Sequence, residues 1–230
     1  MKQKLDGAQF RYINEVLYKT DSTEASKMMQ DDPGMFNKYH SGFRRQVESW
    51  PTNPVDIFIK ELATLPAGSV IADLGCGEAA IAQNMTPRGY CVLSYDLVST
   101  SPFVVAADTC SHIPLPGREE SSDGTVVDVC VCALSLMNSN WLSCVREVRR
   151  VLKNTGKFKV AEVTSRFKDV DKFVELVEKV GFKLLSKRTP STHFTLFEFR
   201  RLPDRPVSEK AWAELTAQQS ILQPCEYKRR

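Results

Sequence analysis

The stretch VIADLGCGEAAIA, residues 70–82, decides the fold of this chain. The stretch begins with apolar residues that end at Asp73, continues through Gly75 and Gly77, and ends in small residues that favour a helix. This order is typical of a buried strand, a tight turn and the start of a helix. Glycine permits the positive φ of a sharp turn and lets a ligand lie against the main chain, and the N–H groups at the start of the next helix are expected to face that ligand. Residues 75–80 also fit the looser dinucleotide pattern G-x-G-x-x-A, so NAD binding is an alternative at this point.

Size and charge narrow the possibilities only partly. A chain of 230 residues, 42% of them hydrophobic, can bury one substantial core with a smaller cap attached. The net charge is +3, but residues 1–140 carry −6 and residues 141–230 carry +9. A cationic half beside an acidic half suits a large anionic substrate such as nucleic acid, and scattered solvated lysines explain it equally well.

The cysteines indicate reduced thiols. There are 7 of them, and no two form a C-x-x-C pair, so we expect buried thiols of an intracellular protein and neither a disulfide framework nor a metal site. The N-terminus lacks the apolar core of a secretory signal, and Asp128 interrupts the longest apolar run. We therefore expect a soluble protein that does not enter a membrane.

Residues 1–66 are expected to form an N-terminal helical cap, and residues 67–230 the ligand-binding domain. The most informative helical segment carries apolar residues at three- and four-residue spacing and is stopped by Pro51; they are Met35, Phe36, Tyr39, Phe43, Val47 and Trp50. His40 lies beside this stripe. It is either an ordinary polar residue at the edge of the stripe or a ligand contact.

The rest of the chain alternates strands and helices. Strands are expected at 90–96, 103–108, 126–137 and 157–164, and helices at 141–153 and 169–181. The segments 182–189 and 193–201 are close enough in sequence to form an antiparallel hairpin, and the tail from Leu202 contains turn-forming residues. This order specifies an α/β doubly wound sheet that binds ligands at the carboxyl ends of its strands.

Carboxylates fall at those strand ends. Asp96 lies 23 positions after Asp73, where an acidic side chain can accept hydrogen bonds from both hydroxyls of a ribose, and Asp108 could contact the amino group of an adenine. A parallel sheet closed by an antiparallel pair resembles the fold of class I S-adenosylmethionine-dependent methyltransferases. An acidic residue such as Asp73 before the glycines suits a positively charged methionine group better than a pyrophosphate.

Motifs along nearly the whole chain are more specific. LDGAQFRYINEVLY, YHSGF, WPTNPVD, ALSLMNSN, KVAEVTSRF, STHF and the terminal QPCEYKRR together resemble the nucleomethylin family, called ribosomal RNA-processing protein eight in fungi. The resemblance implies a Rossmann-like, seven-stranded methyltransferase sheet with an antiparallel C-terminal hairpin. It also implies methylation of adenine N1 in large-subunit ribosomal RNA, with S-adenosylmethionine, in the nucleolus. Members commonly carry a basic N-terminal extension, so this sequence is expected to be the catalytic domain.

The resemblance also implies the cofactor contacts. The residues expected to bind S-adenosylmethionine are His40, Asp73, Gly75, Gly77, Asp96, Asp108, Thr109 and Ala133. His40 would reach the cofactor from the cap, and Asp108 with Thr109 would frame its adenine. Thr109 stands where the animal pattern has methionine, and Ala133 where it has cysteine, which leaves main-chain contacts possible and side-chain packing on the adenine in doubt.

The acceptor atom explains why no catalytic base stands out. Adenine N1 has an in-plane lone pair and no proton to lose, so positioning should dominate catalysis and the base must be unpaired or extruded. Six residues at strand ends could hold it, and each fits an ordinary loop position equally well; they are Ser135, Asn138, Glu162, Arg166, Phe167 and His193.

Three other functions stay open from the sequence. A small-molecule methyltransferase would carry a loop like residues 110–125, and a nucleolar or chromatin scaffold would bind the cofactor and partner proteins without turnover. An NAD-dependent reductase would use the same glycine turn.

Overall fold

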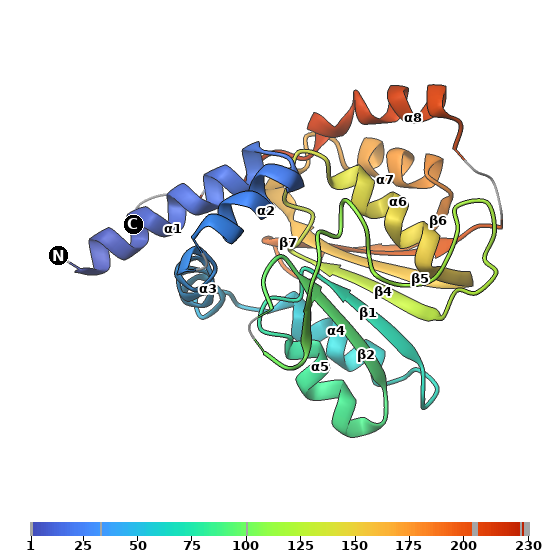
Figure 1. Cartoon of the computed structure of the whole chain (residues 1–230), viewed down its shortest axis with the longest axis horizontal. Coiled ribbons are helices and arrows are strands. Elements are labelled where there is room, and N and C mark those ends of the chain that lie inside the picture. The colour runs from blue at the N-terminus through green and yellow to red at the C-terminus, as the bar shows by residue number, and fades with distance from the viewer. Residues whose placement is uncertain (1, 33, 100, 204–206, 226, 228–230) are drawn as a thin grey trace.

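A single seven-stranded sheet organises the chain in the computed structural model, which describes residues 2–32, 34–99, 101–203, 207–225 and 227 (Figure 1). The strands lie in the order β3-β2-β1-β4-β5-β7-β6. Their bounds are β1 Val70–Leu74, β2 Cys91–Asp96, β3 Val104–Ala106, β4 Val127–Ala133, β5 Leu152–Val163, β6 Phe182–Arg188 and β7 Phe194–Arg201. The first five run parallel, and β7 pairs antiparallel with both β5 and β6. The predicted doubly wound sheet and its C-terminal hairpin are confirmed.

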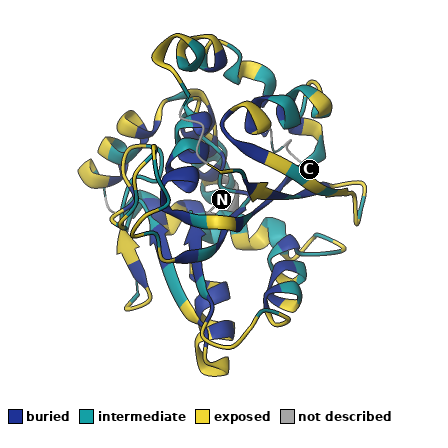
Figure 2. Cartoon of the chain, turned by 90° about the vertical axis from the view of Figure 1, so that its right-hand side faces the viewer, coloured by how far each residue is buried: buried dark blue, intermediate teal, exposed yellow. Residues whose placement is uncertain are grey.

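Helices cover both faces of the sheet. On one face lie α4 (Pro54–Leu62) and α5 (Ala80–Met85), and on the other lie α6 (Trp141–Val151), α7 (Val170–Lys179) and α8 (Glu209–Thr216) (Figure 1). Short 3-10 turns occur at Thr86–Arg88, Thr164–Arg166 and Gln219–Ile221. The buried residues form a band along the strands and the inner helix faces, and the loops are exposed (Figure 2). This distribution is expected for parallel strands covered on both sides.

The first three helices form a layer of their own beside the sheet: α1 (Lys2–Lys19), α2 (Ser22–Asp31) and α3 (Gly34–Val47). Their apolar faces share a separate core that includes Phe10, Met29 and Tyr39. Asn14 Nδ2 donates to Cys225 O at 2.8 Å, which ties this layer to the end of the chain. By contrast, α4 packs into the core of the sheet. The division at residue 66 stays a prediction, and this packing favours assigning α4 to the sheet.

Two segments differ from their predicted form. β5 begins at Leu152, before the expected start at 157, because Leu152 pairs with Val127 and the strand continues through a local irregularity at Thr155, whose φ is 65°. The tail also contains α8, which the turn-forming residues concealed. Its start is fixed by Ser208, whose side chain accepts from Ala211 N, and the Arg146 guanidinium lies 4.7 Å from the Trp212 ring centroid.

The described residues include all seven cysteines and every helix named above. None of the seven cysteines forms a disulfide, and Cys130, Cys132, Cys144 and Cys225 are buried. Within the described part of the chain, no helix combines the length and apolarity that crossing a membrane requires. The same residues contain no group of three or more His, Cys, Asp or Glu side chains that could hold a metal ion.

Candidate active site

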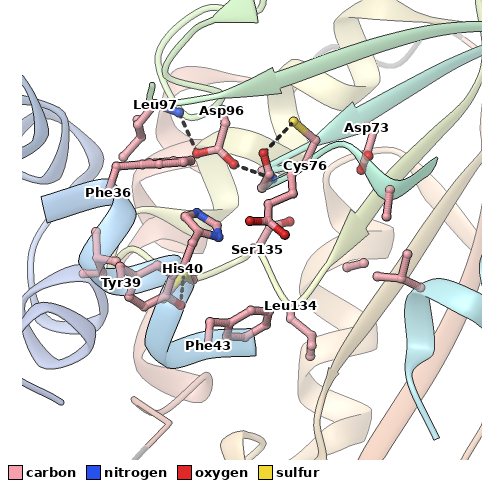
Figure 3. Close-up of a pocket in the computed structure, with 18 of the residues that line it drawn as sticks. Phe36, Tyr39, His40, Phe43, Asp73, Cys76, Asp96, Leu97, Leu134 and Ser135 are labelled. Carbon is pink, nitrogen blue, oxygen red and sulfur yellow. Dashed lines mark hydrogen bonds between the residues drawn. The ribbon is translucent and has the colours of Figure 1, made fainter. Parts of the chain in front are cut away.

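A cavity of about 430 Å³ lies between α3 and the carboxyl ends of β1, β2 and β4 (Figure 3). Its volume is in the range of small-molecule sites. The structure brings together at this cavity all the residues that the sequence predicted for the cofactor: His40, Asp73, Gly75, Gly77, Asp96, Asp108, Thr109 and Ala133. Strand ends that are far apart in sequence therefore converge on one site, as open α/β sheets arrange them.

The glycine turn after β1 forms one wall of the cavity. Gly75 has φ +70°, and a Cβ added there would lie 2.4 Å from Ser135 Cβ, so only glycine lets this turn approach the loop after β4. The N–H groups of Gly75 and Cys76 both donate to Tyr95 O, and that of Gly77 donates to Asp96 Oδ2 at 2.7 Å. These N–H groups are used inside the protein. The turn therefore offers a ligand mainly a bare main-chain surface.

Two carboxylates, of buried Asp73 and partly buried Asp96, give this end of the cavity its charge. Asp73 is 4% exposed, and burial together with the Asp96 carboxylate raises its pKa to about 7. Burial also raises the pKa of Asp96 to about 6, although the N–H groups of Gly77 and Leu97 oppose this by donating to it. Among the described residues, no lysine or arginine forms an ion pair with either carboxylate. This end of the cavity therefore favours a cation.

His40 reaches the cavity from α3. A Cβ added to Gly77 would lie 3.0 Å from His40 Cε1, so the imidazole covers the glycine turn. Burial, with a smaller contribution from the nearby Arg44 guanidinium, lowers the pKa of His40 to about 4, so the ring is neutral near pH 7. Arg44 also forms an ion pair with Glu78, which links α3 to the residue after the turn. The cap is thereby held against the glycine turn.

These residues fit S-adenosylmethionine. The unpaired carboxylates of Asp73 and Asp96 suit a ligand that carries a sulfonium, an ammonium and a ribose diol, because such a ligand supplies both positive charge and hydroxyl donors. Asp108 and Thr109 follow β3, at the neighbouring edge, where the adenine would lie. A pyrophosphate would instead place negative charge beside these two carboxylates.

Only two of the six residues predicted to position the substrate line the cavity, namely Ser135 and Asn138. Glu162 and Arg166 are 0% and 1% exposed and form an ion pair of 2.6 Å below the cavity. Arg166 also donates to Leu136 O and to Gln223 O, and Glu162 accepts from Leu136 N. Their polar atoms are consumed in holding the loop after β4. The structure therefore corrects the expectation that they contact a base.

Phe167 and His193 also lie outside the cavity. The Phe167 ring packs against Phe173 and Phe197 on the face of the sheet that α7 covers. His193 is exposed in the loop between β6 and β7. It is next to Phe194 in sequence, and their ring centroids are 6.2 Å apart. We therefore assign Phe167 to the core and leave His193 as a residue near the site.

Sequence reasoning missed the aromatic lining of the cavity. Phe36, Tyr39, Phe43 and Trp50 all line it, together with Leu134. The sequence carries a signal, because these four aromatic residues recur at helical spacing in the stripe beside His40. Such a stripe is equally typical of a helix face buried against other helices. Only the three-dimensional structure therefore shows which of these residues line the cavity and which belong to the core.

The fold and the arrangement of this cavity define a class I S-adenosylmethionine-dependent methyltransferase domain. The solved structure of Burkholderia thailandensis 1,6-didemethyltoxoflavin-N1-methyltransferase shares the fold, with a TM-score of 0.58 at 15% identity, covering 80% of this chain and 91% of that chain. Residues 1–230 match the family described as hypothetical methyltransferase.

Relatives at higher identity narrow the family. The chain is 44% identical to ribosomal RNA-processing protein 8 of Mus musculus, covering 100% of this chain and 47% of that protein. It is also 44% identical to the 25S rRNA (adenine(645)-N(1))-methyltransferase of Schizosaccharomyces pombe, covering 100% of this chain and 71% of that protein. The chain belongs to the ribosomal RNA-processing protein 8 family. It spans about half the length of several curated relatives, among them the mouse protein.

Proposed function

We propose that this chain transfers a methyl group from S-adenosylmethionine to N1 of an adenine in a large-subunit ribosomal RNA. The observation that carries the proposal is a pair of carboxylates, buried Asp73 and partly buried Asp96, which face one cavity without a basic partner among the described residues. The fission yeast relative, named as an adenine-N1 methyltransferase of 25S rRNA, supports the choice of acceptor.

The residues of the chain would act by binding and alignment. S-adenosylmethionine supplies an electrophilic methyl group on a positively charged sulfur. Asp96 would accept hydrogen bonds from the ribose, Asp73 would stabilise the positive charge of the methionine group, and Ser135 would border the path of the methyl group. No base is required, because adenine N1 carries no proton. Holding the two reactants in line accounts for the rate enhancement.

The proposal places the chain in the nucleus and nucleolus, because ribosomal RNA is made and processed there. The excess of basic residues after position 140 supports an RNA substrate, since positive charge attracts the phosphate backbone.

The test is methyl transfer from labelled S-adenosylmethionine to two substrate pools, ribosomal RNA from cells that lack this enzyme and a small-molecule extract. We expect label in large-subunit RNA and a primer-extension stop at one adenine, because an N1-methyl group blocks base pairing. The Asp96→Ala variant is the matched inactive control. Label in the extract alone would contradict the proposal. So would cofactor binding without transfer to RNA, or a nicotinamide cofactor that displaces S-adenosylmethionine.

A further inference from the structure

The cavity runs along the ends of four neighbouring strands. It begins beside Asp108 after β3 and Asp96 at the end of β2, passes Gly75 after β1, and reaches Ser135 after β4. These strands are consecutive in the order β3-β2-β1-β4-β5-β7-β6. An extended nucleoside with a methionine tail would follow this row, so the next space along the sheet lies over β5 and β7.

Trp50 and Phe43 occupy that next space. The Trp50 ring centroid is 4.8 Å from that of Phe194, the first residue of β7, which pairs with Val163 at the end of β5. The Phe43 ring is 5.6 Å from Trp50 at an interplanar angle of 83°. The two rings therefore form a corner at this end of the cavity. A flat base that stacks on one ring would meet the other ring edge-on.

The side chains around this corner differ from those at the carboxylate end. Both rings are only partly buried, and the neighbouring lining residues Val47, Val55 and Leu134 are apolar. Polar groups come from Asn53 and from Arg44 and Glu48, which also line the cavity. The side-chain oxygen of Asn53 accepts from Val55 N at 3.0 Å, and its NH₂ group makes no hydrogen bond to any residue that the structure describes. Apolar walls with a few polar groups are typical of a site for an uncharged aromatic ligand.

Leu134 separates the two ends of the cavity. Its φ is +61°, which is unusual for a branched residue, and its N–H donates to Ala161 O at 2.8 Å. In Figure 3 its side chain lies beside Phe43, while Ser135 lies toward Asp96 and Cys76. Backbone held in such a conformation is concentrated at functional sites. The turn thus directs adjacent residues toward opposite ends of one cavity.

We propose that Phe43 and Trp50 form the site for the acceptor base, stacking the extruded adenine and stabilising the positive charge that it gains. The inference rests on the proposed function and adds the residues that hold the acceptor. Adenine N1 uses its lone pair to form the bond to the methyl carbon, while the electron pair of the broken carbon–sulfur bond returns to sulfur. The base therefore becomes cationic as the sulfur becomes neutral. Aromatic faces stabilise such a cation.

The direct test measures base binding without turnover. Short oligouridylates with and without one central adenosine are titrated into the chain loaded with S-adenosylhomocysteine, and tryptophan fluorescence is recorded. We expect adenosine-dependent quenching in the wild type and its loss in Trp50→Phe, which removes the reporter ring and keeps an aromatic wall. Trp50→Leu and Phe43→Leu should each weaken binding of the adenosine oligonucleotide roughly 10- to 100-fold. Trp50→Phe should retain most of the affinity.

The controls separate base stacking from a structural role. Tyr12→Leu, at a ring that is 61% exposed on the same cap, should bind like the wild type. S-adenosylhomocysteine affinity should be nearly unchanged in every variant that folds, and Trp50→Phe and Tyr12→Leu should also keep the wild-type unfolding temperature. Trp50 also packs on Phe194, so Phe43→Leu tests the corner independently if Trp50→Leu does not fold. Unchanged oligonucleotide binding in Phe43→Leu and Trp50→Leu would overturn the inference. Equal loss of both ligands would overturn it too, because the corner would then belong to the cofactor site.

Methyl-transfer kinetics keep this inference distinct from the proposed function. Wild-type chain that methylates ribosomal RNA should lose activity in Trp50→Leu through a higher KM and a lower kcat, whereas Trp50→Phe should recover much of both. Wild-type kinetics in Trp50→Leu would overturn the inference and leave the proposed function intact. Adenosine-dependent quenching in a chain that transfers no methyl group to RNA would support the base site and contradict the reaction.

Discussion

The two ends of the cavity are built on different physical principles. The end beside Asp73 and Asp96 uses two carboxylates and a bare glycine turn, all carried by the sheet. The end beside Phe43 and Trp50 uses ring surfaces supplied by α3 and the segment that follows it. Carboxylates suit a cofactor that is always the same cation, whereas ring surfaces suit a base that is neutral on arrival and charged after reaction. We therefore expect the sheet to specify the donor and the cap to specify the acceptor.

Breaking the buried ion pair between Arg166 and Glu162 should impair both the carboxylate end and the aromatic end of the cavity, because the pair holds the loop after β4. Arg166→Met leaves Glu162 buried without a partner and frees the loop after β4, so we expect a loss of about 3–5 kcal/mol in the free energy of unfolding. Denaturant titration measures it, with Arg188→Met at a half-exposed ion pair as the control. The double variant Glu162→Met with Arg166→Met should recover part of the stability. If Arg166→Met is stable and loses only RNA affinity, Arg166 contacts the substrate as the sequence predicted.

Asp96→Ala should affect the carboxylate end alone. It removes the acceptor for the ribose hydroxyls and the partner of Gly77 N, so S-adenosylmethionine affinity should fall on the order of 100-fold, while fluorescence quenching by the adenosine oligonucleotide persists. Calorimetry of the cofactor measures the first effect, with the exposed Asp123→Ala as the control. Wild-type cofactor affinity in Asp96→Ala would contradict the assignment of this end.

The sequence predicted the carboxylate end more completely than the aromatic end. Gly75, Asp96 and Asp108 follow recognisable strands, and the topology of a parallel sheet brings such strand ends together. Trp50 lines the cavity with its ring packed on Phe194, which is far away in the sequence. A pattern of neighbouring residues cannot predict that contact. Arg166 follows a strand as the predicted residues do, yet its side chain turns inward to Glu162. The direction of a side chain near the end of a strand depends on its interaction partners. The spacing of apolar residues in the sequence does not reveal those partners.

The pH dependence of cofactor binding should show whether the charge of Asp73 and Asp96 contributes to affinity. With the pKa of Asp73 at about 7 and that of Asp96 at about 6 in the free chain, a bound cation favours their ionised forms and releases protons. Affinity for S-adenosylmethionine should therefore fall as the pH drops from 8 toward 6, by up to about tenfold per unit for each proton released. S-adenosylhomocysteine, which lacks the sulfonium charge, should show a weaker dependence. Calorimetry in buffers of different ionisation enthalpy counts the protons, and equal slopes for both ligands would contradict the role of Asp73.

The same raised pKa values predict the stability of the chain without ligand. An aspartate in water has an ordinary pKa of 3.8, so between about pH 4 and pH 7 the native state holds a proton on Asp73 that the unfolded state has lost. The contribution of this group to stability is present at low pH and is lost as the pH rises through 7. Asp73→Asn should flatten that decline, as measured by thermal unfolding across this range. A decline that is unchanged in Asp73→Asn would assign it to other groups.

His193→Ala should give the smallest effect, at the aromatic end. His193 is exposed beside Phe194 and does not line the cavity, so RNA affinity should change by only about twofold. Filter binding of the ribosomal RNA substrate measures it, with Thr192→Ala in the same loop as the control. A loss as large as that of Trp50→Leu would extend the acceptor site onto the loop between β6 and β7.

A crystal structure of the chain with S-adenosylhomocysteine would show which end of the cavity holds the donor. We expect the ribose at Asp96, the adenine beside Asp108, the amino-acid tail over Gly75, and the sulfur facing an open corner between Phe43 and Trp50. An adenine stacked between Phe43 and Trp50, or a tail that fills that corner, would contradict this expectation.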